Sequence, residues 1–145
     1  MYTIFEPTSK DEFNKYLILR WRLLRFPWGG KKGSEIDDME GVSIHRAIKD
    51  RKGQLVAVGR IHFINQNAQI RYMAVQNSHR KKGLGTKLIL ELEKIALINK
   101  IKMVFLNSRE NAIEFYRKNG YSTICETDSS FGNIIHYRME KNLDN

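Results

Sequence analysis

The segment Arg80-Lys81-Lys82-Gly83-Leu84-Gly85-Thr86 constrains this chain most, because it lies between a predicted strand and a predicted helix. Residues 69–75 alternate and then become apolar, as in a strand that enters a core. Residues 84–95 repeat leucine and isoleucine at helical spacing. The free N–H groups of a helix's first turn attract an anion, and Gly83 and Gly85 let the backbone approach it closely. The sequence therefore predicts a phosphate site at this turn.

The turn lacks two common phosphate-binding motifs. A P-loop needs glycine, four residues, and then Gly-Lys-Ser or Gly-Lys-Thr, and the sequence contains no such string. The dinucleotide-binding fingerprint needs three spaced glycines, whereas residues 80–86 contain two. The pattern that is present, Arg-x-x-Gly-x-Gly between a strand and a helix, resembles the coenzyme A pyrophosphate loop of the GNAT superfamily of N-acetyltransferases.

Residues 111–121 strengthen this resemblance. They read Asn-Ala-Ile-Glu-Phe-Tyr-Arg-Lys-Asn-Gly-Tyr, which is similar to the second GNAT signature, and they follow a predicted strand at 103–107. The two motifs stand in the family's order, about thirty residues apart, with a helix and a strand between them. The resemblance covers roughly residues 42–141 and is weakest in the first forty.

The pattern of apolar residues and turns predicts a mixed α/β fold in one domain, residues 1–145. Tight connections make the second, third and fourth strands antiparallel, whereas a helical crossover makes the fifth strand parallel to its neighbour. The resemblance implies a mostly antiparallel central sheet of about seven strands, with flanking helices and a parallel central pair that splays apart. The expected strands are 3–5, 42–49, 54–63, 68–75, 102–107, 121–126 and 133–141, and the expected helices are 9–25, 84–99 and 109–119.

Composition narrows the class of protein. A chain of 145 residues with 41% hydrophobic and 28% charged content can bury one core. No apolar run approaches the ~20 residues that span a bilayer, and no secretory signal is visible, so we expect a cytoplasmic protein without a membrane partner. The single cysteine, Cys125, suits a reducing compartment. The formal charge is +9, but the basic residues are scattered, so nucleic-acid binding is not expected. The sequence is compatible with a homodimer.

The resemblance implies that the chain uses acetyl-CoA as a co-substrate. The backbone of Met73, Ala74 and Val75 is then expected to hydrogen-bond the pantetheine arm like an added strand, and one N–H group to stabilise the developing oxyanion. Asn111 matches a helix-opening asparagine that contacts the cofactor. The pyrophosphate contacts fall, mostly through main chain, on Arg80, Lys81, Lys82, Gly83, Leu84, Gly85 and Thr86.

Tyr116 matches the family's tyrosine that faces the coenzyme sulfur, while its neighbour Phe115 is expected in the core. In this chemistry a neutral amine attacks the acetyl thioester, and a thiolate leaves. A phenol with a pKa near 10 stays protonated at neutral pH. Tyr116 is therefore expected to act as the general acid on the leaving sulfur, as well as to contact the cofactor.

The general base is less defined. Some relatives carry a carboxylate or histidine four residues before the first cofactor-contacting strand residue, where this chain has Gln69. Three options remain: a water relay, a residue on another strand, or an acceptor amine that is already partly neutral. Among side chains, His62 is the best candidate, because imidazole titrates near neutrality. His45, His79 and His136 have weaker claims, and four scattered histidines predict no metal site.

The acceptor is expected to be a primary amine, with a small molecule preferred over a protein lysine or N-terminus. Substrate choice in the family lies in the first helix, the loop after it and the last hairpin, here residues 20–33, 34–41 and 127–134. Trp21 and Trp28 are candidates to wall the acceptor pocket. The candidates to attract a cationic amine are Asp37, Asp38 and Glu40.

A coenzyme-A-binding domain without turnover is an alternative from another class. It is motivated by Gln69, which cannot usefully accept a proton at the position where some relatives carry a base. Binding of acetyl-CoA without release of free thiol in the presence of amines would distinguish this domain from an enzyme.

Overall fold

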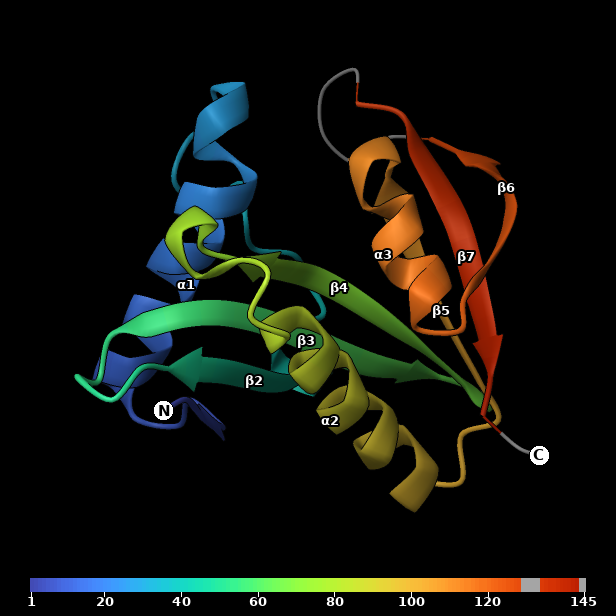
Figure 1. Cartoon of the computed structure of the whole chain (residues 1–145), viewed down its shortest axis with the longest axis horizontal. Coiled ribbons are helices and arrows are strands. Elements are labelled where there is room, and N and C mark those ends of the chain that lie inside the picture. The colour runs from blue at the N-terminus through green and yellow to red at the C-terminus, as the bar shows by residue number, and fades with distance from the viewer. Residues whose placement is uncertain (129–133, 144–145) are drawn as a thin grey trace.

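The computed structural model describes residues 1–128 and 134–143, which form one seven-stranded sheet and its flanking helices (Figure 1). The strand order is β1-β2-β3-β4-β5-β7-β6. Neighbouring strands are antiparallel except β4 and β5, which are parallel, as the sequence predicts. The strands are β1 (Thr3–Phe5), β2 (Ile44–Lys49), β3 (Leu55–Ile64), β4 (Asn67–Val75), β5 (Met103–Arg109), β6 (Ser122–Thr127) and β7 (His136–Asn142).

Three α-helices in the described part of the chain cover the sheet. α1 (Lys10–Leu24) begins with a capping box, in which Ser9 and Glu12 each accept a hydrogen bond from the other's backbone N–H. α2 (Leu84–Ile98) is the crossover between β4 and β5, and α3 (Ile113–Lys118) follows β5. In Figure 1, α2 lies in front of β2–β4 with α1 behind them, and α3 lies beside β5 and β7. No helix among the described residues is long and apolar enough to cross a membrane.

The core lies on both faces of the sheet, because successive residues of a strand point to opposite sides. On one face Tyr16 of α1 packs against Val58 of β3. On the other face Leu88 of α2 packs against the neighbouring Ala57. The side chains of α2 and α3 continue this second layer across β4, β5 and β7. Both faces of the central strands are therefore buried.

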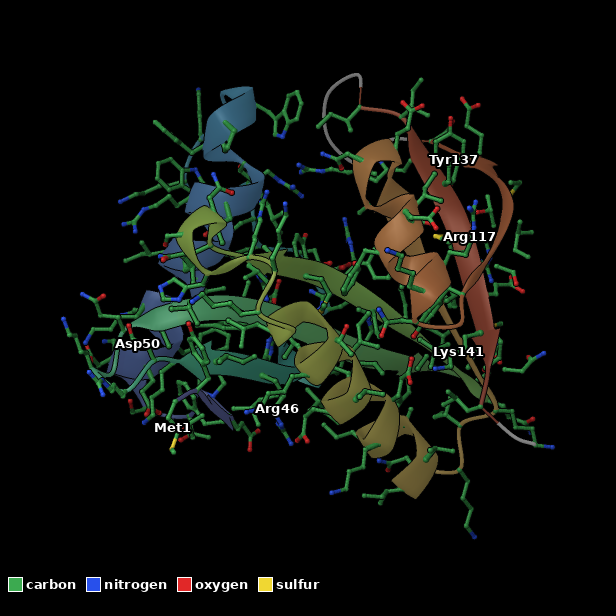
Figure 2. The ribbon with its side chains drawn as sticks, in the orientation of Figure 1. Met1, Arg46, Asp50, Arg117, Tyr137 and Lys141 are labelled. Carbon is green, nitrogen blue, oxygen red and sulfur yellow. The ribbon has the colours of Figure 1, made fainter. Side chains whose placement is uncertain are left out.

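A polar network joins α2 to β7 near the end of the sheet where β4 and β5 pair. The Tyr121 hydroxyl donates to Glu93 Oε2 at 2.7 Å, and Lys141 Nζ lies 2.9 Å from Glu93 Oε1. Lys141, labelled in Figure 2, also donates to the Asn119 carbonyl at 2.9 Å. Burial raises the pKa of Tyr121, and the Glu93 carboxylate raises it further, so this hydroxyl remains a donor.

Four boundaries differ by two residues or more from those expected from the sequence. β2 begins at Ile44 rather than at residue 42, because Glu40–Val42 form a 3₁₀ turn before it. β5 continues to Arg109, because this residue still pairs with His136 of β7. α3 begins at Ile113, because Glu110–Ala112 form a separate 3₁₀ turn before it. The last strand begins at His136, and the expected start at residue 133 lies outside the described residues.

Candidate active site

β4 and β5 separate part-way along their length. Their parallel pairing runs from Asn67 with Met103 to Ile70 with Leu106 and ends there, although β4 continues for five more residues and β5 for three. In Figure 1 the two strands lie together near the C-terminus and diverge away from it. The expected splay of the central pair is confirmed. It leaves the facing edges of both strands without a ladder partner, so their backbone groups are available to a ligand.

A cavity of about 500 Å³ adjoins this unpaired edge. It lies between the end of β4, the following turn, the first turn of α2, and α3. The structure brings together here all but one of the residues expected to contact the cofactor, the exception being Lys82. Its lining residues are Met73, Ala74, Val75, His79, Arg80, Lys81, Gly83, Leu84, Gly85, Thr86, Asn111, Ala112, Phe115 and Tyr116.

The N-terminus of α2 has the features of an anion site. No side chain caps it, whereas α1 has a complete capping box. The N-cap residue, Gly83, adopts φ of 76°, and Lys81 adopts φ of 62°, so the turn before the helix is tight. The first-turn residues 84–86 line the cavity, and the first N–H groups of an α-helix have no intrahelical partner. These donors fit a pyrophosphate.

The two glycines of this turn have different roles. A Cβ on Gly83 would meet nothing within 4 Å, so the positive φ is what favours glycine in the free protein. A Cβ on Gly85 would lie 2.8 Å from Cζ of Phe115. Gly85 therefore lets α3 pack against α2, in addition to any approach of a ligand. Phe115 packs against the core, as expected, and also lines the cavity.

A smaller cavity of about 230 Å³ adjoins the larger one and is also lined by Tyr116. It is enclosed by the end of α1, the separated parts of β4 and β5, and the start of β7. Met73, Ala74, Arg80, Asn111, Ala112 and Tyr116 line both cavities. The remaining lining residues are Leu23, Leu24, Arg25, Ile70, Arg71, Tyr72, Leu106, Asn107, Ser108, Arg109, Asp128 and His136.

Tyr116 lies on α3 where the two cavities meet. Its side chain is buried, yet its hydroxyl makes no hydrogen bond to any described residue. Burial raises the pKa of Tyr116, and the positive charge of Arg109 opposes this only in part. The phenol is thus protonated throughout the physiological range, with its proton available to a bound molecule.

Tyr72 occupies a β-bulge in the separated part of β4. The pairing with β3 shifts there, so that Gly59 lies opposite both Tyr72 and Met73. Tyr72 has φ of 57°, which is rare for an aromatic residue. A Cβ on Gly59 would lie 2.8 Å from Met73 Sδ, so a larger residue opposite the bulge would force the Met73 side chain to shift. The Tyr72 ring centroid lies 4.2, 5.5, 5.0 and 4.7 Å from the guanidinium carbons of Arg20, Arg25, Arg60 and Arg71.

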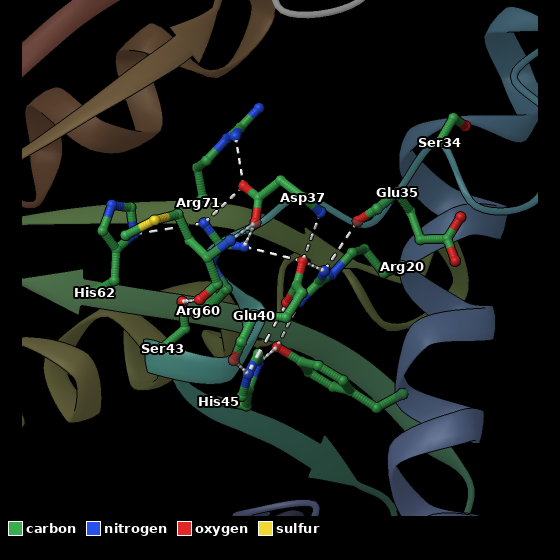
Figure 3. Close-up of polar contacts among 12 residues, drawn as sticks. Arg20, Ser34, Glu35, Asp37, Glu40, Ser43, His45, Arg60, His62 and Arg71 are labelled. Carbon is green, nitrogen blue, oxygen red and sulfur yellow. Dashed lines mark hydrogen bonds and ion pairs between the residues drawn. The ribbon is translucent and has the colours of Figure 1, made fainter.

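Two of the three acidic residues expected to attract an amine, Asp37 and Glu40, are instead held by arginines (Figure 3). Asp37 contacts Arg60 at 2.6 Å and Arg71 at 2.8 Å. Glu40 contacts Arg20 at 2.7 Å and Arg60 at 3.0 Å. Burial alone would raise the pKa of Asp37, but hydrogen bonds and the nearby positive charges lower it to about 2. Neither carboxylate lines a cavity, and both neutralise core charge.

His62, the candidate base from the sequence, lies away from both cavities. It is buried on β3, where its Nδ1 is 3.4 Å from an Arg60 nitrogen. Figure 3 shows it beside Arg60 at the edge of this ionic cluster. Burial lowers the pKa of His62, and the charge of Arg60 lowers it further. The structure does not bring His62 together with Tyr116.

His136 is the histidine that does line the smaller cavity. Its Nδ1 lies 3.0 Å from the Ile134 carbonyl oxygen, which can only accept a hydrogen bond, so Nδ1 carries a proton. Nε2 of the neutral ring then has a free lone pair. Burial lowers the pKa of His136, and the charges of Arg109, Arg25 and Arg71 lower it further. His136 is therefore neutral at pH 7.

Comparison with known proteins identifies the family. The sequence profile of the acetyltransferase (GNAT) family matches residues 6–121. An uncharacterized N-acetyltransferase from Bacillus subtilis, YjcF, is 31% identical over 107 residues, which cover 74% of this chain and 76% of that protein. The chain belongs to the GNAT family.

The fold agrees with this assignment. An aminoglycoside 6'-N-acetyltransferase solved with coenzyme A superposes with a TM-score of 0.81, at 18% identity, over 100% of this chain and 98% of that one. A GNAT acetyltransferase from Staphylococcus aureus superposes with a TM-score of 0.80, at 16% identity, over 99% and 100% of the two chains. The protein is thus a GNAT N-acetyltransferase. Two solved proteins with a similar fold, this aminoglycoside 6'-N-acetyltransferase and an N-acetyltransferase from Thermoplasma acidophilum, are complexes with coenzyme A.

Two cavity residues of this GNAT enzyme, Arg25 and Arg109, have no role that the sequence predicts, and His136 is only a weaker candidate for the base there. Arg25 directly follows α1, Arg109 ends β5 and His136 begins β7, so each lies at or next to the end of an element and shows no periodic pattern. The family resemblance assigns no role to Arg25 or Arg109, although Arg25 lies within residues 20–33, one of the segments expected to determine substrate choice. The tryptophans do not line either cavity, but the Trp28 ring centroid lies 5.5 Å from the guanidinium carbon of Arg109. Within the described residues, no His, Cys, Asp and Glu cluster could hold a metal ion.

Proposed function

We propose that this GNAT enzyme transfers the acetyl group of acetyl-CoA directly to the primary amine of a small-molecule acceptor. The observation that supports this most is the pair of cavities that adjoin at Tyr116. The larger cavity contains the uncapped start of α2 and the unpaired edge of β4, and we assign it to the coenzyme. The smaller one we assign to the acceptor. A reaction at their junction needs no covalent enzyme intermediate, because both substrates reach the same point.

The chain's own groups fit coenzyme A. Donors at 84–86, with Arg80 and Lys81, match its pyrophosphate, and the backbone of 73–75 offers the pantetheine arm an open strand edge. Lys82 does not line the cavity, so its role would be confined to long-range attraction. When bound, acetyl-CoA supplies a thioester that an amine can attack. A backbone N–H of 73–75 then stabilises the oxygen that becomes negative, an effect worth a few kcal/mol.

The proton transfers follow from Tyr116 and His136. A bond forms between the acceptor nitrogen and the acetyl carbon, and the carbon–sulfur bond breaks. Tyr116 donates its proton to the leaving sulfur. His136 Nε2 accepts the proton that the acceptor nitrogen loses, directly or through one water. His136 then releases its proton to solvent and Tyr116 regains one, so the enzyme returns to its starting state.

A small acceptor suits the smaller cavity better than a protein chain does. Its volume, about 230 Å³, is below the usual range of drug-sized pockets. Arg109 also crosses from β5 to the end of α1, where it donates to the Leu24 carbonyl at 3.0 Å. This contact closes one side of the cavity against an extended peptide. A lysine side chain alone could enter, and a protein acceptor is the outcome to exclude by experiment.

The proposal is tested in two steps. Isothermal titration should first show that acetyl-CoA binds, and a thermal unfolding scan should show a higher Tm, since a ligand that binds only the native state stabilises it. A thiol-release assay over a library of small primary amines and lysine peptides should then show acetyl-CoA turnover with at least one small amine. Unchanged unfolding at millimolar acetyl-CoA would overturn the cofactor assignment. Binding without thiol release would favour a coenzyme-A-binding domain, and turnover with peptides only would favour a protein acceptor.

A further inference from the structure

Guanidinium groups dominate the smaller cavity. Four arginines line it, whereas the described lining contains one carboxylate, that of Asp128. A cavity for a plain cationic amine would be expected to show the opposite balance, because like charges repel. The four are Arg25, Arg71, Arg80 and Arg109, and they come from the C-cap of α1, β4, the following turn and β5. Segments that are far apart in the sequence thus bring four positive charges to the lining of the smaller cavity.

The positions of these arginines are held by neutral groups for the most part. Arg109 donates to the Leu24 carbonyl and lies over the Trp28 ring, and it forms no ion pair with a described residue. Arg25 Nε donates to the Ser34 carbonyl at 3.0 Å. Arg71 contacts the carboxylate of Asp37, which it shares with Arg60. Carbonyl groups and ring faces orient a guanidinium without cancelling its charge, so the cavity stays positive.

The arginines also act on one another. Arg25 is buried and Arg109 is partly buried, and burial lowers the pKa of each. The charge of Arg25 further lowers the pKa of Arg109, and the charge of Arg71 further lowers that of Arg25. Such mutual repulsion destabilises the empty site, and a bound anion would relieve it.

We propose that the acceptor carries an anionic group, a carboxylate or a phosphate, beside its primary amine, and that Arg25, Arg71 and Arg109 bind this group. This inference rests on the proposed function, because it assigns the smaller cavity to the acceptor. Planar guanidinium groups suit both anions, since they can form two parallel hydrogen bonds to either. The anion would lie toward β5 and α1, which directs the amine toward Tyr116.

The cofactor's phosphates have a separate place. Lys81, Gly83 and the first-turn residues 84–86 line only the larger cavity, and Arg80 alone of the four arginines lines both. The other three arginines are therefore not needed for the pyrophosphate.

The same three arginines also favour the reaction, because a positive environment lowers the pKa of the acceptor's bound ammonium group. This makes the amine neutral, and hence nucleophilic, at a lower pH.

Thermal unfolding and titration calorimetry with the full chain test the proposal. With coenzyme A saturating, and again without it, the protein is titrated with matched probes at constant ionic strength: β-alanine against propylamine, and O-phosphoethanolamine against ethanolamine. We expect at least one anionic probe to bind and raise the Tm while its partner does not. The first pair tests whether the site binds a carboxylate, and the second pair tests whether it binds a phosphate. The same pairs are then compared as acceptors in the thiol-release assay.

Two variants separate the anion site from general charge. Arg109→Gln should weaken binding of the anionic probe roughly 10- to 100-fold, the effect of losing charge-assisted hydrogen bonds. Arg138→Gln should leave it unchanged, because Arg138 also lies over an aromatic ring, that of Phe105, but lines neither cavity. Coenzyme A affinity should be the same in both. Arg109→Lys should recover part of the loss if charge is what matters.

Some outcomes would overturn the inference while leaving the enzyme's function intact. Coenzyme A binding together with no preference for either anionic probe is one such result, and tighter binding of the neutral-tailed amines is another. Equal probe affinity in Arg109→Gln and Arg138→Gln would also overturn it. Failure of coenzyme A itself to bind would instead contradict the proposed function, and the probes titrated without coenzyme A would still decide whether the anion site exists.

Discussion

Ile70 and Leu106 form the last parallel pair between β4 and β5. Beyond this pair the two strands diverge, and both cavities use the residues that follow it. α3 lies where the cavities meet, and its Tyr116 lines both. The point at which the hydrogen-bonded pairing of β4 with β5 ends thus determines where a coenzyme and an acceptor can meet.

Gly83→Ala should weaken acetyl-CoA binding, and Gly53→Ala is its matched control. Both glycines have positive φ, 76° and 86°, and a Cβ on either would meet nothing within 4 Å. Both variants should therefore lose about 1–2 kcal/mol of unfolding free energy from backbone strain. Only Gly83 faces the larger cavity, so only its variant should show a higher Kd by calorimetry. Equal affinities in the two variants would contradict the placement of the pyrophosphate.

Tyr116→Phe should retain coenzyme binding and lose kcat by about 10²–10⁴-fold, because the ring stays while the proton donor is removed. The loss should shrink for acyl donors with a better leaving group. Tyr137→Phe is the control, since Tyr137 lies on β7 outside both cavities (Figure 2). Steady-state rates and calorimetric affinities measure both effects. A Tyr116→Phe rate like that of wild type would leave Tyr116 with a packing role only.

The pH dependence of kcat/KM should identify the base. A base works when neutral, so the rate should fall as pH drops through the pKa of His136, which lies below the ordinary value of about 6.5. His136→Gln should remove this acidic limb. His62→Gln should keep it, because His62 lines neither cavity. Profiles are compared with an acceptor from the library. An unchanged limb in His136→Gln would point to a water relay or to the amine itself.

Asp37 should make stability depend on acid pH. Its pKa is lowered from 3.8 to about 2 by the arginines, so it stabilises the fold above pH 4. This contribution, ~2 kcal/mol, is lost as pH falls toward 2. The depressed pKa of buried His45 adds an earlier loss as pH falls below about 6.5, since the unfolded state then binds more protons. Urea unfolding from pH 7 to 2 should show less loss below pH 4 in Asp37→Asn than in exposed Asp11→Asn.

Gly85→Ala should destabilise the fold through Phe115. The new Cβ would lie 2.8 Å from Phe115 Cζ, which forces α2 and α3 apart or the ring out of place. Phe115→Leu removes the clashing ring atoms. In a double-mutant cycle of unfolding free energies, the two changes together should therefore be less harmful than the sum of the single changes. Additive effects would show that α3 moves freely.

Much of the site's location could be predicted from the sequence. The turn at 80–86 is a local feature, and its two glycines and basic residues sit next to a clear helical repeat. The motif at 111–121 placed Tyr116 in the same way. These predictions concern residues that act through their own backbone or through a fixed place in a motif. The structure accordingly brings all but Lys82 of the expected cofactor residues to one cavity.

The acceptor side could not be predicted in the same way. Asp37 and Glu40 look like solvent-exposed acids in a loop, yet the fold turns them onto Arg20, Arg60 and Arg71. The sequence alone does not distinguish the imidazole of His62, which lies away from both cavities, from that of His136, which lines the smaller one. The bulge at Tyr72 changes which residues share a face, and no local pattern marks it.

The sequence by itself determined the order of strands and helices, the anion-binding turn and the tyrosine of the second motif, because local periodicity, glycine and motif spacing are properties of neighbouring residues. The tertiary structure decided which charges meet. Arg25, Arg109 and His136 stand at or next to the ends of three different elements, and only the separation of β4 from β5 brings them into one cavity. Charges interact through space rather than along the chain, so the character of the acceptor site emerges only when these ends converge.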